Sequence, residues 1–173
     1  MTAEDNIHQL GCQLHIKTFD QLTVNELYTL LRIRSEVFIV EQNCIYQDVD
    51  DNDQTAIHLW MTRDGKTVAM CRICPRGTKI KETSIGRVIT TERGKGYGLA
   101  LMTAAIEVAK ERFSPLQCID IESQATKQHF YERLGFRAIS EPFMMEGLPH
   151  LNMRLNISTQ YESDTCTDGH QDG

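Results

Sequence analysis

A strand-like segment that runs straight into a glycine-rich turn and then into a helix constrains this chain most. Residues 84–91 (SIGRVITT) are rich in β-branched side chains, and the glycines of residues 92–98 (ERGKGYG) stop the strand. Apolar residues then recur at helical spacing until Ser-Pro follows Phe113, so we expect a helix over 96–113. This order of strand, turn and helix is typical of α/β folds.

The remaining patterns place further elements around this unit. We expect a helix over 24–40, a hairpin of strands 56–62 and 67–74 with a turn at 63–66, a strand over 117–123, a helix over 126–134, and strands over 136–139 and 151–157. Together they predict one α/β domain over residues 1–157. Residues 158–173 hold almost no apolar side chains, so we expect a disordered polar tail there.

The composition argues against several functional classes. The chain has 173 residues, 40% of them hydrophobic, and a formal net charge of −6, so it lacks the basic excess that nucleic acid or an anionic membrane requires. No apolar run approaches the roughly 20 residues of a membrane span, and the N-terminus does not look like a signal peptide. We therefore expect a cytoplasmic protein that binds neither nucleic acid nor membrane.

Two local patterns suggest metal sites, and their spacing argues against both. Cys71 and Cys74 form a CxxC inside a strand-like run, but no second Cys or His pair lies at ligand spacing, so we expect reduced thiols and no metal. Residues 48–53 (DVDDND) have the aspartate spacing of a calcium loop without its glycine and its closing glutamate. We interpret this acidic cluster as a solvated turn.

The glycine-rich turn itself predicts an anion site. Free backbone N–H groups and the positive end of a helix dipole meet at such a turn, and glycine lets a phosphate approach closely. A P-loop is excluded because Gly96, not Ser or Thr, follows Lys95. The dinucleotide fingerprint GxGxxG fits in part, with Gly94 and Gly96 present but Leu99 in the third position. A dinucleotide-binding oxidoreductase and a purely structural turn stay open as alternatives.

A third loop pattern fits better. The run RGKGYG matches Arg/Gln-x-x-Gly-x-Gly/Ala and resembles the coenzyme A pyrophosphate loop of the GCN5-related N-acetyltransferases (GNAT). IGRVIT before the loop and FYERLGF after it follow the order of elements in that family. LLRIRSEVFIVEQNCIYQDVD and GLPH are similar to its ElaA-like branch, so the resemblance covers about residues 20–155. It implies an α/β fold with a mixed, splayed central sheet and flanking helices in a single domain.

The resemblance also implies acetyl-CoA as a co-substrate and main-chain roles around the loop. Val88 and Thr90 would pair with the pantetheine arm, and the N–H of Val88 or Ile89 would stabilise the oxyanion formed on attack. Val88 and Ile89 can be core residues at the same time. The pyrophosphate would lie on the backbone N–H groups of Arg93, Gly94, Lys95, Gly96, Tyr97 and Gly98.

Three side chains match positions that resemble catalytic ones. Tyr131 would protonate the departing thiolate, because a phenol has a higher pKa than a thiol, although it can also be a packing residue. Glu41 and His150 are candidate bases for the acceptor ammonium or structural residues, with Glu41 as a partner of Arg34. Glu122 is a weaker candidate base. Four further residues match the branch and either shape the acceptor pocket or hold buried ion pairs: Arg34, Arg72, Arg87 and His58.

We therefore expect an N-acetyltransferase that passes the acetyl group of acetyl-CoA to an amine by direct attack in a ternary complex, with no cysteine nucleophile. The acceptor would be a small-molecule or peptide amine, and a homodimer stays open because relatives often pair. A non-catalytic acyl-CoA-binding sensor is the alternative from a different class. It would bind the co-substrate without releasing thiol.

Overall fold

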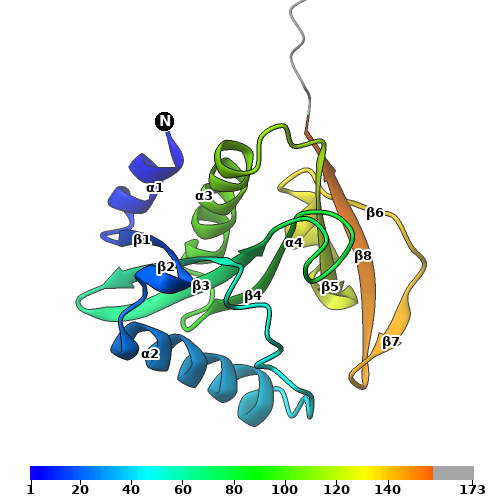
Figure 1. The fold of residues 1–173 in the computed structure, drawn as a ribbon, viewed down its shortest axis with the longest axis horizontal. Helices are drawn as coiled ribbons and strands as arrows, with labels where there is room; N and C mark the ends of the chain where they lie inside the picture. Colours follow the sequence, from blue (N-terminus) through cyan, green and yellow to red (C-terminus); the bar gives the residue numbers. More distant parts are fainter. Residues whose placement is uncertain (158–173) are drawn as a thin grey trace, which may run out of the picture.

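An eight-stranded mixed sheet organises the computed structural model, which describes residues 1–157 (Figure 1). The strands are β1 (Gln13–Thr18), β2 (Ile57–Arg63), β3 (Lys66–Cys74), β4 (Ser84–Thr90), β5 (Cys118–Gln124), β6 (Arg137–Ala138), β7 (Phe143–Met145) and β8 (Leu148–Asn156). The helices are α1 (Ala3–Gln9), α2 (Val24–Arg34), α3 (Tyr97–Arg112) and α4 (Gln128–Glu132), with short 3-10 turns η1 (Phe19–Gln21) and η3 (Ala125–Lys127) and a π-helix η2 (Ser35–Glu41). The expected tail, 158–173, lies outside the described residues.

The sheet opens in its middle. Its order is β1-β2-β3-β4-β5-β8-β6, with β7 on β8, and neighbouring strands are antiparallel except β4 and β5, which are parallel. These two strands pair only at Ser84 and Asp120 and then diverge, as Figure 1 shows between their labels. The opening confirms the predicted mixed, splayed sheet with flanking helices.

Helices cover both faces of the sheet because the strands alternate apolar side chains between the faces. On one face, α2 packs Leu30 and Ile33 against Trp60, Met70 and Ile89 from β2, β3 and β4. The other face lies against α1 and α3 and holds the larger core. The fully buried side chains of this core include Leu59, Met61, Ile73, Leu101, Met102 and Ile119.

The hairpin and the long helices lie close to where the sequence places them. Asp64 and Gly65 join β2 to β3 with φ of 50° and 75°, which is the two-residue Asp-Gly turn that hairpin twist favours. The helix expected over 24–40 is α-helical only to Arg34 and continues as the π-helix η2. There Gln42 N–H donates to the Val37 carbonyl, five residues back, at 2.9 Å.

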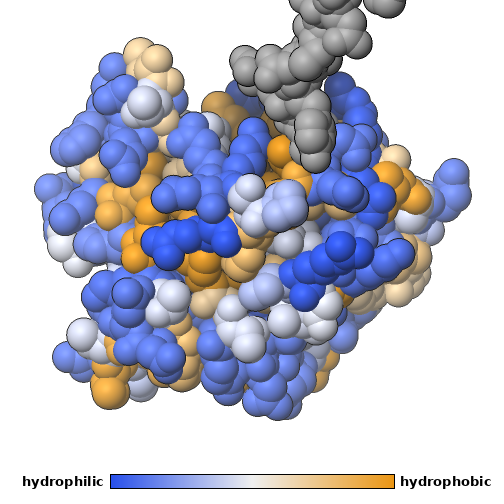
Figure 2. Space-filling view, turned by 45° about the horizontal axis from the view of Figure 1, so that its top comes forward, coloured by the Kyte–Doolittle hydropathy of each residue, from blue (hydrophilic) through white to orange (hydrophobic). Residues whose placement is uncertain are grey.

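Several short elements escape the sequence patterns. The polar start contains α1 and β1, although α1 has only seven residues and owes its start to a capping box between Thr2 and Asp5. β7 was also not expected, and β6 is reduced to two residues. The face drawn in Figure 2 is mostly hydrophilic, with smaller apolar areas between the polar residues. None of the helices within residues 1–157 is long and apolar enough to cross a membrane.

Candidate functional site

The divergence of β4 and β5 creates a cavity of about 310 Å³ at the centre of the sheet. β4 contributes residues 84–88 to its wall, and β5 contributes residues 121–124. Tyr131 from α4 and His150 from β8 also line it, together with residues of β3 and of the loops around the opening. Beyond Ser84 no residue of β4 pairs with β5 within the described chain, so the β4 edge on this cavity offers free backbone groups to a ligand.

A β-bulge shapes the β4 wall at Arg87. Met70 pairs with Ile89, whereas Arg72 pairs with Gly86, so Arg87 and Val88 lie opposite the single residue Cys71 and β4 carries one extra residue. Arg87 has a φ of 55°, in the left-handed region. Bulges of this kind re-aim the backbone beside many active sites.

The three predicted β4 residues lie on different sides of the strand. Val88 lines the cavity and also packs against the main core. Ile89 is buried against α2. The Thr90 methyl group faces Gly98, where an added Cβ would lie 3.4 Å from it. Only Val88 therefore presents its side chain to the cavity.

The glycine-rich loop contains two residues in the left-handed region of backbone conformation. Gly94 and Gly96 have φ of 75° and 80°, values that residues other than glycine rarely adopt. A Cβ at Gly94 would meet no atom within 4 Å, so packing does not require glycine there. The need for glycine at this position comes from the backbone conformation or from a ligand that approaches it. Gly96 is the N-cap of α3 and provides no side chain to cap its N–H groups, which leaves them free for an anion. The backbone N–H groups at this turn are therefore available to an anion.

The two ends of the loop differ in exposure. Arg93 and Lys95 are exposed, whereas the side chain of Tyr97 is buried in the core and its hydroxyl accepts a hydrogen bond from Arg63 Nη1 at 2.9 Å. At Gly98 a Cβ would lie 3.4 Å from Phe130 Cζ, so this position packs closely against α4. Tyr97 can contribute only its backbone to a ligand.

Tyr131 lies in the cavity wall with its ring held from two sides. Phe130 and Phe136 contact the ring edge-on at centroid distances of 5.0 and 6.0 Å. Burial raises the pKa of the Tyr131 phenol above its ordinary value, and the neighbouring Cys71 adds to this. Among residues 1–157 its hydroxyl makes no hydrogen bond, so a protonated phenol is available to a ligand.

His150 is oriented by its own strand. Its Nδ1 lies 2.8 Å from the Leu148 carbonyl oxygen, which can only accept, so Nδ1 carries the proton. In the neutral ring, Nε2 then keeps its lone pair and can accept a proton. His150 is 8% exposed and lines the cavity that Tyr131 also lines.

The two carboxylates named as candidate bases occupy different places. Glu41 is exposed, lies outside the cavity wall and forms an ion pair with Arg93 of the loop at 3.1 Å. Glu122 lines the cavity and lies 4.0 Å from Lys79 Nζ. The structure therefore brings Tyr131, His150 and Glu122 to one cavity and places Glu41 beside the phosphate loop.

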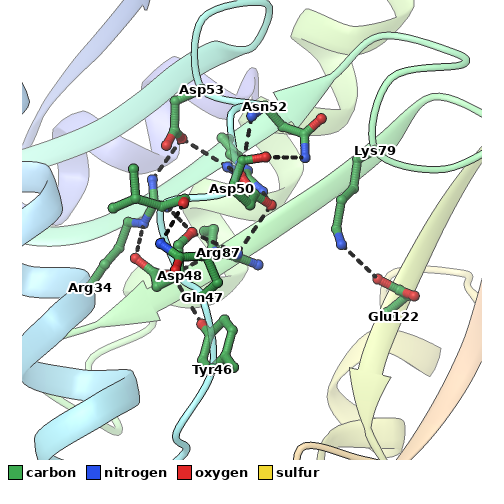
Figure 3. Close-up of polar contacts among 12 residues, drawn as sticks. Arg34, Tyr46, Gln47, Asp48, Asp50, Asn52, Asp53, Lys79, Arg87 and Glu122 are labelled. Carbon is green, nitrogen blue, oxygen red and sulfur yellow. Dashed lines mark hydrogen bonds and ion pairs between the residues drawn. The ribbon is translucent and has the colours of Figure 1, made fainter.

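The acidic cluster at 48–53 is not a solvated turn, and that interpretation was wrong. Asp48 and Asp53 are buried, and three guanidinium groups hold the cluster against β3 and β4 (Figure 3). Arg34 donates from Nε to Asp48 at 2.9 Å and from Nη1 to Asp53 at 2.7 Å, so its partners are these aspartates and not Glu41. The other contacts are Arg72 to Asp50 and Asp53, Arg87 to Asp48 and Asp50, and His58 Nε2 to the Asp53 carbonyl.

This Arg–Asp network keeps its carboxylates ionised. Burial alone raises the pKa of Asp50, but hydrogen bonds from Arg72 and Asn52 outweigh it and hold that pKa well below its ordinary value. Burial opposes ionisation of Asp53 in the same way, and Arg34 and Arg72 lower its pKa in spite of it. The resemblance had left buried ion pairs open for Arg34, Arg72, Arg87 and His58, and this alternative is the one that the structure bears out for the three arginines.

Cys71 and Cys74 lie on opposite faces of β3, so they cannot bind one ion together. Cys71 belongs to the main core, whereas Cys74 lines the cavity. Burial raises the pKa of both thiols, which keeps them protonated and poorly nucleophilic. Of this pair only Cys74, already named as part of the CxxC, lies at the cavity, and Cys44 is a second thiol in the cavity wall.

Comparison with known proteins places this site in a family. The family model of the acetyltransferase (GNAT) domain matches residues 18–157. The chain belongs to the GNAT family. A protein of the UPF0039 family from Schizosaccharomyces pombe is 38% identical over 144 residues, which span 82% of this chain and 95% of that protein. Protein ElaA from Escherichia coli is 36% identical over 141 residues, 79% of this chain and 92% of ElaA.

Solved structures of this GNAT branch agree with the fold. Escherichia coli ElaA has a TM-score of 0.77 at 34% identity, covering 83% of this chain and 98% of its own. An acyl-CoA N-acyltransferase from Pseudomonas aeruginosa has a TM-score of 0.76 at 35% identity, covering 82% and 98%. This GNAT protein is thus of the ElaA-like branch and has the fold of acyl-CoA-dependent transferases.

Proposed function

We propose that this GNAT protein transfers the acetyl group of acetyl-CoA to an amine by direct attack, with both substrates bound together. One observation carries the proposal: a single cavity joins the free edge of β4 to the Tyr131 hydroxyl and the His150 imidazole. These groups are what aminolysis of a thioester needs, namely a polarising N–H, an acid for the thiolate and a base for the ammonium.

Each proton in the proposed reaction has a place. Nε2 of His150, directly or through a water molecule, takes the proton of the acceptor ammonium, and the free amine attacks the thioester carbonyl. The N–H of Val88 or Ile89 stabilises the oxyanion, the new C–N bond forms and the C–S bond breaks. Tyr131 then donates its phenolic proton to the thiolate, which suits a phenol whose pKa burial has raised. The second proton lost by the acylated nitrogen returns through a water molecule to the Tyr131 phenolate, so the product is a neutral amide.

The assignments of the co-substrate residues follow from the loop geometry. The pyrophosphate would lie on the N–H groups of residues 93–98, and the pantetheine arm would pair with Val88 and Thr90 along the open edge of β4. Lys127 also lines the cavity, and desolvation and the positive charge of Arg93 lower its pKa. These cations would serve the anionic co-substrate, and Glu41 would hold Arg93 in position.

The size of the cavity favours a short acyl group. About 310 Å³ is at the lower limit of ordinary ligand pockets, and both the acyl group and the acceptor must share it. Isothermal titration with acetyl-CoA and octanoyl-CoA, with NADH as a control, tests the co-substrate, and thiol release on an amine panel tests turnover. Binding of acetyl-CoA without thiol release from any amine would favour the sensor instead, and binding of NADH would refute the loop assignment.

A further inference from the structure

Arg87 presents one edge of its guanidinium to the cavity. Its Nε lies 2.7 Å from Asp48 Oδ1, and its Nη2 donates to the Asp48 carbonyl at 2.9 Å and to Asp50 Oδ2 at 3.3 Å. Within residues 1–157, Nη1 donates to no acceptor, and it is not among the fully buried unpaired atoms. Because Arg87 is a wall residue of the cavity, its two Nη1 N–H groups are available to a ligand there.

The charges behind this edge are already balanced. The network holds three arginines and three aspartates, and Asp50 receives both nitrogens of the Arg72 fork at 2.7 and 2.6 Å. Asp50 lines the cavity, but its oxygens are occupied by these bonds. An anion at the Nη1 edge of Arg87 therefore meets a cation whose neighbouring carboxylates are neutralised.

A second cation lines the same cavity. Figure 3 shows Lys79 and Glu122 beside the network, with the Lys79 ammonium directed to the Glu122 carboxylate on β5. Their separation of 4.0 Å and side-chain exposures of 35% and 29% describe a loose pair. Lys79 can turn from Glu122 to a ligand at little cost. Lys127, by contrast, lies near Arg93 and belongs to the co-substrate end.

We propose that the acceptor is a small amine that also carries a carboxylate, as a free amino acid does. The carboxylate would bind the Nη1 edge of Arg87 with help from Lys79, while the ammonium lies toward His150 and Glu122. The cavity of about 310 Å³ has room for such a molecule beside an acetyl group and no room for a folded protein. This inference rests on the proposed function and names its substrate class.

Matched pairs of acceptors test the inference. Thiol release is measured with acetyl-CoA and a panel of free amino acids, each compared with its C-terminal amide, which keeps the amine and lacks the carboxylate. We expect kcat/KM to favour the acid form by roughly 10- to 100-fold for the best pair, the range of a charge-assisted hydrogen bond. The preference should lie mostly in KM and should weaken at high salt.

Two variants locate the carboxylate site. Arg87→Gln should abolish the preference for the acid form, and its folding is checked by urea denaturation because Arg87 also holds Asp48 and Asp50. Lys79→Met, which leaves the network intact, should reduce the preference several-fold. Lys81→Met, an exposed neighbour outside the cavity wall, is the control and should keep it.

The outcomes separate the two proposals. Equal turnover of acids and amides by the wild-type protein would overturn the carboxylate inference and leave the acetyltransferase proposal standing. A preference for acids that survives both Arg87→Gln and Lys79→Met would overturn the assignment of these residues. Absence of thiol release with every amine would refute the proposed function and this inference with it.

Discussion

Replacing Arg34 with methionine tests how much the buried Arg–Asp network contributes to stability. Arg34 is 2% exposed and makes three hydrogen bonds, to Asp48 Oδ2, to the Asp48 carbonyl and to Asp53 Oδ1, at 2.9, 2.8 and 2.7 Å. Methionine fills much of the same volume, so the loss is electrostatic and not a cavity effect. Removing one partner of a buried ion pair costs about 3–5 kcal/mol, and we expect Arg34→Met to destabilise the fold by that amount.

Urea denaturation at pH 7 measures this loss. At the usual scaling for a chain of this length, it corresponds to a fall in Tm of roughly 10 °C. Arg32→Met is the matched control, because Arg32 lies two residues away on α2, is 54% exposed and bonds only Glu36, so its loss should stay under about 0.5 kcal/mol. A loss below about 1 kcal/mol for Arg34→Met would refute the view that the network supports the fold.

The pH dependence of the same experiment has a definite sign. Burial opposes the ionisation of Asp50 and Asp53, but hydrogen bonds from the arginines outweigh it. Both carboxyl groups therefore have folded-state pKa values below those of the unfolded chain. Their contribution to stability is therefore fully present above the unfolded pKa of about 4 and is lost as the pH falls toward the folded pKa. In Arg34→Met the pKa of Asp53 should rise, so the deficit of the variant should shrink between about pH 5 and pH 3.

Four further predictions concern the proposed reaction. Tyr131→Phe should lower kcat on the order of 100-fold or more and leave acetyl-CoA affinity within about twofold, since the ring contacts stay; an unchanged kcat would exclude the phenol as acid. His150→Asn should lower kcat/KM on the order of 100-fold, and an unchanged kcat/KM would assign the base elsewhere. Gly94→Ala should weaken acetyl-CoA binding about tenfold, as measured by isothermal titration. Gly77→Ala is the control, because Gly77 lies in the β3–β4 loop and has a similar φ of 78°. It should lose comparable stability and keep its affinity for acetyl-CoA. Cys74→Ala should retain activity, and an acetyl-thioester on this thiol in the wild type, seen by mass spectrometry, would contradict direct transfer.

The sequence predicts the fold well wherever a long periodic pattern exists. The apolar stripe of α3, the Asp-Gly hairpin and the glycine loop each depend on local chemistry, and the structure places all three as expected. α1 and β1 were missed because seven- and six-residue elements with mixed burial leave too short a period to recognise. The π-helix η2 could not be predicted, since its hydrogen-bond register depends on packing and not on a residue pattern.

The site was predictable only in part, because its residues meet through the sheet and not along the chain. Tyr131 and His150 face one cavity since α4 and β8 both adjoin β5, a fact that only topology supplies. The acidic run 48–53 looked like a surface turn because composition cannot show that partners at Arg34, Arg72 and Arg87 fold over it. The local density of aspartates suggested that the run is exposed to solvent. Its ion pairs with the three distant arginines instead bury Asp48 and Asp53.

The bulge of β4 and the Arg–Asp network form one structural unit. A φ of 55° at Arg87 costs on the order of 1–3 kcal/mol, and such a conformation persists only where its surroundings hold it. The bonds from Arg87 to Asp48 and Asp50 hold it from the side chain, at the place where β4 leaves β5. The polar contacts of Arg34 within residues 1–157 go to Asp48 and Asp53 of the same aspartate loop. Arg34→Met should therefore reduce stability and keep the preference for carboxylate acceptors. Arg87→Gln should remove that preference. The two variants thus separate stabilisation of the bulge by the Arg–Asp network from binding of the acceptor carboxylate by Arg87.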